Sequence, residues 1–87
     1  MMKVKILEEV LAEVERAERL NPLWPKDRVE GAAIVVEEAG EALKEALNMR
    51  PYDRNYAKSS PLLYWKELIQ TAAMALRALK EEEKRCG

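Results

Sequence analysis

The chain has 87 residues, of which 48% are hydrophobic and 36% are charged, with 15 Lys and Arg against 16 Asp and Glu. This composition is typical of a folded globular domain and excludes a disordered chain, and the net charge of −1 gives no general attraction to nucleic acid or to anionic lipid. So short a chain buries a small fraction of its surface, which favours association with further copies.

Residue counts also restrict the chemistry. There is no histidine, and Cys86 is the single cysteine, so Ser–His and Cys–His nucleophile pairs, an intrachain disulfide and histidine-containing metal sites are excluded. Carboxylates, amides, hydroxyls, Lys and Arg remain. The first residues carry no signal-peptide apolar stretch and no apolar run reaches membrane-spanning length, so we expect a cytoplasmic protein with no membrane partner.

The first predicted helix covers residues 4–20. Its apolar side chains recur at the spacing of one helix face, with two leucines widening the stripe: Ile6, Val10, Val14, Ala17, Leu7 and Leu11. The segment from Asn21 to Pro25 ends this helix, because each proline lacks an amide donor and restrains the preceding residue. Trp24 lies in this segment, between Leu23 and Pro25.

Two further helices follow. Asp27 is a suitable N-cap for a helix that runs to about residue 48, and residues 49–60 form a loop. Ser60 caps a third helix, which begins at Pro61 and runs to about residue 84, with a frayed tail from about residue 81. No segment resembles a strand. The sequence therefore predicts a single all-α domain over residues 1–87, a small antiparallel bundle of three main helices that is completed by homo-oligomerisation.

Three carboxylates interrupt the apolar part of the second helix. Glu37, Glu38 and Glu41 lie among Ala, Ile and Val residues, and residues three or four apart share a helix face. Repeated carboxylates on a half-buried surface repel one another and resist the loss of solvent. A divalent cation that prefers oxygen ligands, such as Mg²⁺, is the simplest source of compensating charge.

The third helix repeats the same three-residue step with Glu67 and Gln70 on an otherwise apolar face. Two helices packed antiparallel would aim this pair and the pair Glu38 and Glu41 at one point, as helical bundles do when they build internal metal sites. Because Glu is also a good helix former, a solvated or salt-bridged face is the alternative interpretation.

Together these motifs resemble the MazG-like all-α NTP pyrophosphatase superfamily, whose signature is Glu-Glu-x-x-Glu on one helix and Glu-x-x-Asp on a later one. The first half stands here as Glu37-Glu38-Ala39-Gly40-Glu41, and the second half reads Glu67-Leu68-Ile69-Gln70. The resemblance covers the chain from about residue 20 to about residue 80, including Trp24-Pro25 before the second helix.

The resemblance implies Mg²⁺-dependent hydrolysis, with Mn²⁺ as a substitute, of nucleoside triphosphates to monophosphate and pyrophosphate, in a house-cleaning role toward non-standard nucleotides. The metal ligands would be Glu38, Glu41, Glu67 and Gln70. Glu37 and Glu38 would be the catalytic residues, with Glu37 as an added ligand or a base that orients the attacking water. Gln70 stands where the family usually has Asp and adds no charge, so weaker metal binding is expected. A non-catalytic oligomeric module that binds nucleotide or metal is the alternative.

Other residues are candidates for substrate binding. Lys44, Arg54 and Lys58 could contact phosphates, or they could be ordinary surface cations. Trp24 could anchor the chain turn, or it could stack on a base. Trp65 on the third helix could stack on a base, or it could lie in the core or in a subunit interface. The expected partners are a nucleoside triphosphate and further copies of the chain, as a homodimer or homotetramer, with no nucleic acid.

Overall fold

The computed structural model describes residues 4–86; residues 1–3 and 87, the ends of the predicted domain, lie outside the described part. It contains three α-helices, α1 (Val4–Leu20), α2 (Arg28–Asn48) and α3 (Pro61–Cys86), and a short 3-10 helix, η1 (Tyr56–Lys58). Residues 4–86 contain no strand, so the predicted all-α class with three main helices is confirmed. The helix ends agree closely with the predicted ones, and α3 includes the segment expected to fray.

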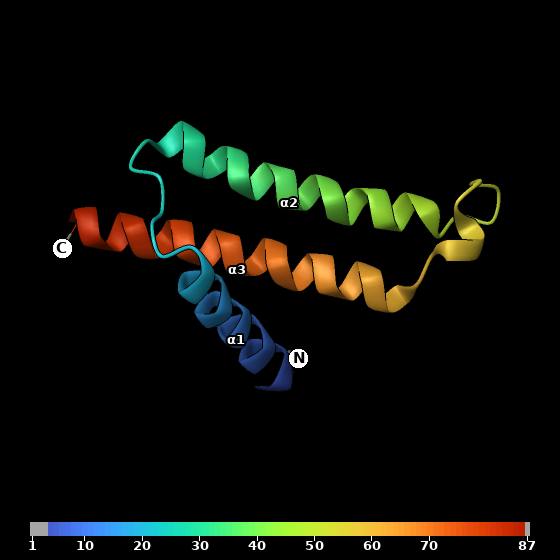
Figure 1. Ribbon diagram of the computed structural model, residues 1–87, viewed down its shortest axis with the longest axis horizontal. Helices are drawn as coiled ribbons and strands as arrows, with labels where there is room; N and C mark the ends of the chain where they lie inside the picture. Colours follow the sequence, from blue (N-terminus) through green and yellow to red (C-terminus); the bar gives the residue numbers. More distant parts are fainter. Residues whose placement is uncertain (1–3, 87) are drawn as a thin grey trace.

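The third helix is the central element. Extensive contacts join α3 to α2 and to α1. In Figure 1, α2 and α3 lie side by side with the start of α2 near the end of α3, and α1 crosses α3 obliquely. The molecule is elongated, with extents of 49 × 30 × 25 Å. None of the helices in the described part of the chain is both long enough and apolar enough to cross a bilayer.

Side-chain caps set where α2 and α3 begin. The Asp27 carboxylate accepts a hydrogen bond from the N–H of Val29 at 3.4 Å, and the Ser60 hydroxyl accepts one from the N–H of Leu62 at 3.1 Å. Each bond satisfies an amide that the first turn of a helix leaves unpaired. Both predicted caps are therefore formed.

The linker between α1 and α2 is held against α3 by Arg77. This residue is only 6% exposed, donates to the carbonyl of Asn21 at 2.6 Å, and has its guanidinium carbon 5.0 Å from the centre of the Trp24 ring. The Trp24 ring in turn covers Gly31, where a Cβ atom would lie 3.0 Å from the indole nitrogen. Trp24 thus anchors the chain turn, the first of its two predicted roles.

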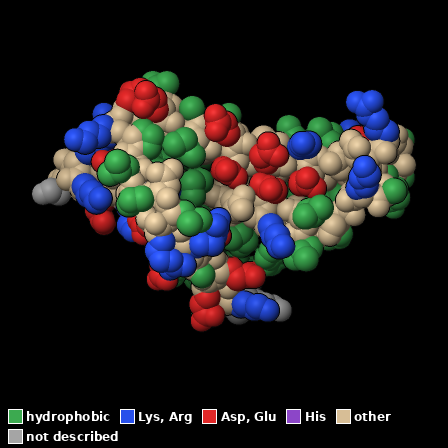
Figure 2. All heavy atoms as spheres, in the orientation of Figure 1, with side chains coloured by type: hydrophobic (Ala, Val, Ile, Leu, Met, Phe, Trp, Pro, Cys, Tyr) green, Lys and Arg blue, Asp and Glu red, His purple; other side chains and the backbone are tan. Residues whose placement is uncertain are grey.

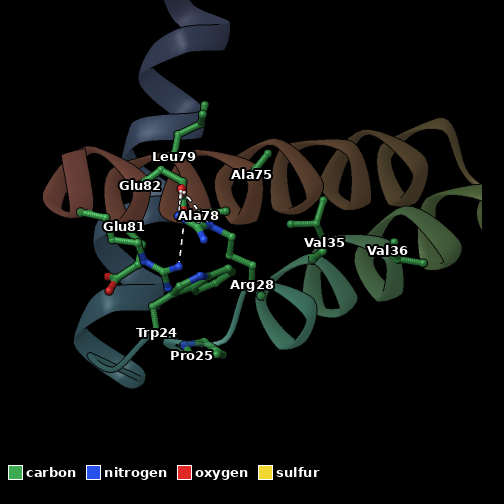
Figure 3. A pocket seen from close by; sticks show the side chains of 13 residues that line it. Trp24, Pro25, Arg28, Val35, Val36, Ala75, Ala78, Leu79, Glu81 and Glu82 are labelled. Atoms are coloured by element: carbon green, nitrogen blue, oxygen red, sulfur yellow. Dashed lines mark hydrogen bonds and ion pairs between the residues drawn. The ribbon is translucent and has the colours of Figure 1, made fainter.

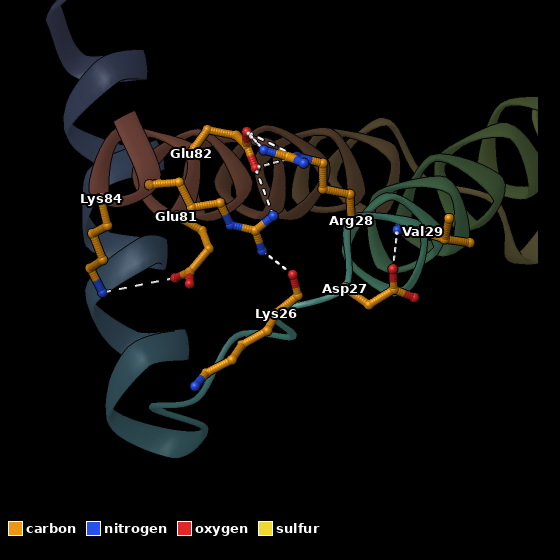
Figure 4. Close-up of polar contacts among 8 residues, drawn as sticks. Lys26, Asp27, Arg28, Val29, Glu81, Glu82 and Lys84 are labelled. Carbon is orange, nitrogen blue, oxygen red and sulfur yellow. Dashed lines mark hydrogen bonds and ion pairs between the residues drawn. The ribbon is translucent and has the colours of Figure 1, made fainter. Parts of the chain in front are cut away.

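Polar contacts close the same end of the molecule (Figure 4). Arg28 at the start of α2 pairs with Glu82 near the end of α3 at 3.0 Å, and Arg85 donates to the carbonyl of Lys26. Surface ion pairs of this kind contribute little to stability. They join the start of α2 and the linker before it to the last turns of α3.

The core is small for a chain of this length. Within residues 4–86 the buried hydrophobic side chains are Val10, Val14, Ala42 and Ala73. Leu7 and Leu11, which widen the apolar stripe of α1, are both exposed. Contact with α3 covers one side of α1 and leaves these leucines outside it.

Candidate metal centre

Two of the predicted carboxylates lie at the junction of α2 and α3. Glu38 is on the side of α2 that carries the buried Ala42, one turn before it, and Glu67 is on α3. Both side chains are half-buried. Figure 2 shows acidic side chains gathered on one face over these two helices.

The charge state of Glu38 reflects this crowding. Its pKa is raised, first because burial disfavours the charged form and then because Glu41, Glu13 and Glu37 repel it. Two of these neighbours lie on α2 beside it, whereas Glu13 lies on α1. The carboxylates that surround Glu38 therefore come from more than one helix.

Glu67, on α3, is affected by carboxylates of α2. Its pKa is raised by burial and then by repulsion from Glu38, Glu41 and Glu45. The Oε2 atom of Glu45 is buried and has no hydrogen-bond partner within the described residues. A buried carboxylate oxygen without a partner is costly, so a cation or an external donor at this point would stabilise the protein.

Glu45 was not predicted as a site residue, although its spacing from Glu41 indicated it. It lies four residues after Glu41 and seven after Glu38, so the three share one face of α2. Extending the three-residue motif by one helical turn would have found it.

α1 supplies a second carboxylate that the sequence did not reveal. The Glu13 side chain is 15% exposed, and Arg16 holds it through two hydrogen bonds of 2.9 and 2.6 Å. Glu13, Glu38 and Gln70 line one open cavity of about 290 Å³. No spacing along α1 signals this position, because Glu13 reaches the site only through the packing of α1 on α3.

A wider groove between α1 and α3 adjoins that cavity and shares Glu13, Arg16 and Gln70 with it. It has a volume of about 680 Å³, and Arg19, Lys66 and Trp65 also line it. A second carboxylate, Glu9, also lines the groove and accepts a hydrogen bond from the Trp65 indole at 3.2 Å. Cations and an exposed aromatic ring together can bind the phosphates and the base of a nucleotide. These cations are functional candidates that the sequence analysis did not name.

The remaining predicted residues lie at the surface. Glu37 and Glu41 are exposed on α2, and so are the three predicted phosphate-binding cations: Lys44 on α2, Arg54 in the loop and Lys58 in η1. None of these five residues lines the cavity or the groove. The structure thus brings Glu38 and Gln70 together at one cavity and leaves the three cations outside it.

The donor atoms of the cluster suit a hard divalent cation, because carboxylate and amide oxygens are the ligands that Mg²⁺ prefers. Within residues 4–86, however, no three carboxylates stand close enough together to hold one metal ion. Glu side chains move by rotation about their side-chain bonds. The chemistry therefore fits a metal, and binding one requires these carboxylates to converge.

No family model, curated protein or solved structure matches this chain. Its own fold and site place it as a small all-α protein in which carboxylates from three helices gather at one junction.

Proposed function

We propose that this protein is a Mg²⁺-dependent nucleoside triphosphate pyrophosphohydrolase of the MazG-like kind, with Mn²⁺ as a substitute metal. It acts in the cytoplasm on non-standard nucleotides, as a homo-oligomer whose copies complete an antiparallel helical bundle. The observation that carries the proposal is a group of neighbouring carboxylates around two half-buried ones, Glu38 on α2 and Glu67 on α3, whose pKa values are raised by burial and then by repulsion from those neighbours.

Such a cluster destabilises the folded chain unless its charge is compensated. Other acids of the protein have partners, as Glu18 has in Lys80 at 2.7 Å. Glu38 and Glu67 make no ion pair with any residue in the range 4–86. This contrast supports a bound cation as the partner of the cluster.

In the proposed site, Glu38, Glu41 and Glu67 hold the metal and the Gln70 carbonyl is a neutral ligand. When bound, the ion neutralises phosphate oxygens and polarises the attacking water. Glu37 is exposed beside Glu38, so its carboxylate can orient that water and accept its proton.

The phosphates and base are proposed to lie in the α1–α3 groove. Arg16, Arg19 and Lys66 provide positive charge there, and the Trp65 ring, which is 42% exposed, can stack on a base. These residues take the role that the sequence analysis gave to cations of α2 and the loop.

A non-catalytic module is the second candidate. Gln70 adds no charge to the ligand set, and no three carboxylates in the described part of the chain stand at metal-binding distance. The chain would then bind nucleotide or metal without turnover.

Pyrophosphate release from a panel of standard and non-standard triphosphates, with Mg²⁺ or Mn²⁺, tests the leading proposal. We expect turnover of at least one nucleotide, and a fall in kcat/KM of at least about tenfold for Glu38→Gln. Glu83→Gln is the matched control, because Glu83 is an exposed acid near the end of α3. Equal rates for both variants would remove Glu38 from the site.

Gln70→Asp separates the two candidates further. If Gln70 is a metal ligand, the added charge should tighten Mg²⁺ binding measured by calorimetry and raise turnover. Unchanged affinity would place Gln70 outside the ligand set. Nucleotide binding without turnover, in both the natural chain and this variant, would favour the module.

A further inference from the structure

The chain exposes more surface than a compact protein of its mass. Its accessible surface is 6812 Å², whereas a compact 10.0 kDa monomer is expected to expose roughly 5,200 Å². The radius of gyration, 14.7 Å, also exceeds the roughly 12 Å expected for 87 residues. The excess surface, on the order of 1,600 Å², lies within the range that one chain buries in an obligate dimer.

One patch of exposed apolar surface lies on the outer face of α2. Val29, Val36 and Leu43 recur every seven residues and are 74%, 68% and 60% exposed. Further apolar or small exposed residues fill the arc around them: Ala32, Ala33, Ala39, Gly40 and Leu47. We call these eight residues the α2 stripe. It contains no charged side chain, although 36% of the residues in the chain are charged.

Gly40 lies in the middle of the α2 stripe. Glycine inside a helix is less favourable than alanine, because its backbone loses more conformational freedom on folding. A Cβ atom on Gly40 would meet nothing within 4 Å, whereas one on Gly31 would meet Trp24 of the same chain. Nothing in the described chain uses the space at Gly40, and this gap would let another helix approach closely.

The α2 stripe continues into a groove between α2 and α3 (Figure 3). The groove has a volume of about 480 Å³ and is lined by Val35 and Val36 from α2 and by Ala75 and Leu79 from α3, with Trp24 at one end. The apolar surface is therefore continuous from the outer face of α2 to α3.

We propose that the α2 stripe packs against the α2 stripe of a second copy, with the two helices running in opposite directions about a two-fold axis. Glu30, Glu37 and Lys44 border the stripe at seven-residue intervals. When the two helices run in opposite directions, Glu30 of each copy lies beside Lys44 of the other, which gives two such pairs. Glu37 of one copy then lies beside Glu37 of the other. A two-fold pair in the same direction would place this edge of one helix against the opposite edge of the other stripe, so neither Glu30–Lys44 pair would form.

A second copy is the occupant because the charged border of the stripe is complementary to itself about a two-fold axis at Glu37, which pairs Glu30 with Lys44 of the second copy on both sides of the axis. The inference rests on the homo-oligomer of the proposed function and is independent of hydrolysis.

Sedimentation velocity of the full chain over a range of concentrations tests this interface. A species of twice the 10.0 kDa chain mass is expected. Val36→Glu should raise the dimer Kd by at least about tenfold, because it buries a charge in the stripe. Leu62→Glu is the matched control, since Leu62 is 59% exposed in a helix but lies on α3, and it should leave the dimer intact. Circular dichroism checks that each variant stays helical.

If Val36→Glu loses its helicity, the border charges decide. Glu30→Lys or Lys44→Glu alone puts like charges together and should raise Kd roughly threefold to tenfold at low salt, and the two changes combined should restore it. A chain that is monomeric at every concentration overturns both this interface and the proposed homo-oligomer. A dimer whose Kd responds to none of these changes overturns this interface alone.

Discussion

Two parts of α3 differ in how their charged side chains are partnered. Toward its C-terminal end, Arg77 donates to a backbone carbonyl of the linker and Lys80 pairs with Glu18 of α1. In its first half, the pKa of Glu67 is raised by burial and then by repulsion from three carboxylates of α2, one of which is Glu38. The C-terminal part pairs cations with a carbonyl and a carboxylate, whereas the first half places a carboxylate near other carboxylates.

The difference separates the residues that hold the fold from those that serve a site. Contacts of Arg77 with the linker and with Trp24 stabilise the described chain by themselves. The repulsion of Glu67 by Glu38 stabilises nothing in the described chain, and in the proposed function a bound cation compensates for it.

Removing Arg77 should break the C-terminal end and give the largest effect. Arg77→Met keeps much of the apolar stem but loses the hydrogen bond to Asn21 and the contact with the Trp24 ring. We expect the free energy of unfolding to fall by about 2–4 kcal/mol, measured by urea denaturation at one fixed protein concentration.

Lys80→Met is the control for that change, because Lys80 is exposed and its ion pair with Glu18 lies at the surface. Its effect should stay below about 1 kcal/mol. Equal losses for the two variants would mean that Arg77 acts only as another surface charge.

Relieving the repulsion in the first half of α3 should have a smaller effect of opposite sign. Without divalent cations, Glu67→Gln should stabilise the folded chain by a few tenths to about 1 kcal/mol, because solvent screens part of the repulsion. Glu83→Gln, an exposed change on the same helix, should be neutral. Saturating Mg²⁺ should stabilise the natural chain but not Glu67→Gln; equal stabilisation of both would show that the ion binds elsewhere.

The pH dependence is the smallest and most general test. Because the folded-state pKa values of Glu38 and Glu67 are raised, the folded chain binds protons at a higher pH than the unfolded chain does. Stability should therefore rise as the pH falls from neutral through these raised values, and this gain ends near about pH 4.3, below which the unfolded carboxylates are protonated too.

Glu18 has the opposite effect on the pH dependence of stability. A hydrogen bond from Lys80 lowers its pKa, so its contribution to the stability of the folded chain is lost as the pH falls through that lowered value. A maximum of thermal stability in mildly acidic, metal-free buffer is expected from the two effects together. In Glu67→Gln the rise toward that maximum should be shallower, and an unchanged rise would contradict the assignment to this cluster.

Much of the local structure was predictable because its causes are close together in the sequence. Asp27 and Ser60 could be named as caps because each precedes a helix whose first amides need an acceptor. The prolines of the linker ended α1 where expected. The face shared by Glu38 and Glu41 also follows from helical spacing alone.

Long-range packing was not predictable in the same way. Glu13 and Arg77 look like ordinary charged helix residues in the sequence, yet one lies beside Glu38 and the other is buried against the linker. Leu7 and Leu11 look like core residues and are exposed. Each outcome depends on which side of α1 meets α3, and no local preference sets that choice.

By itself, then, the sequence determined that this protein is helical, where its helices begin and end, and that acids recur on one face of α2, because propensity, capping and spacing act over a few residues. Only the tertiary structure decided that α1 contributes Glu13 to the same junction and that the uncharged face of α2 is left uncovered. Those facts depend on the relative placement of whole helices, which is set by the sum of many weak contacts far apart in the chain.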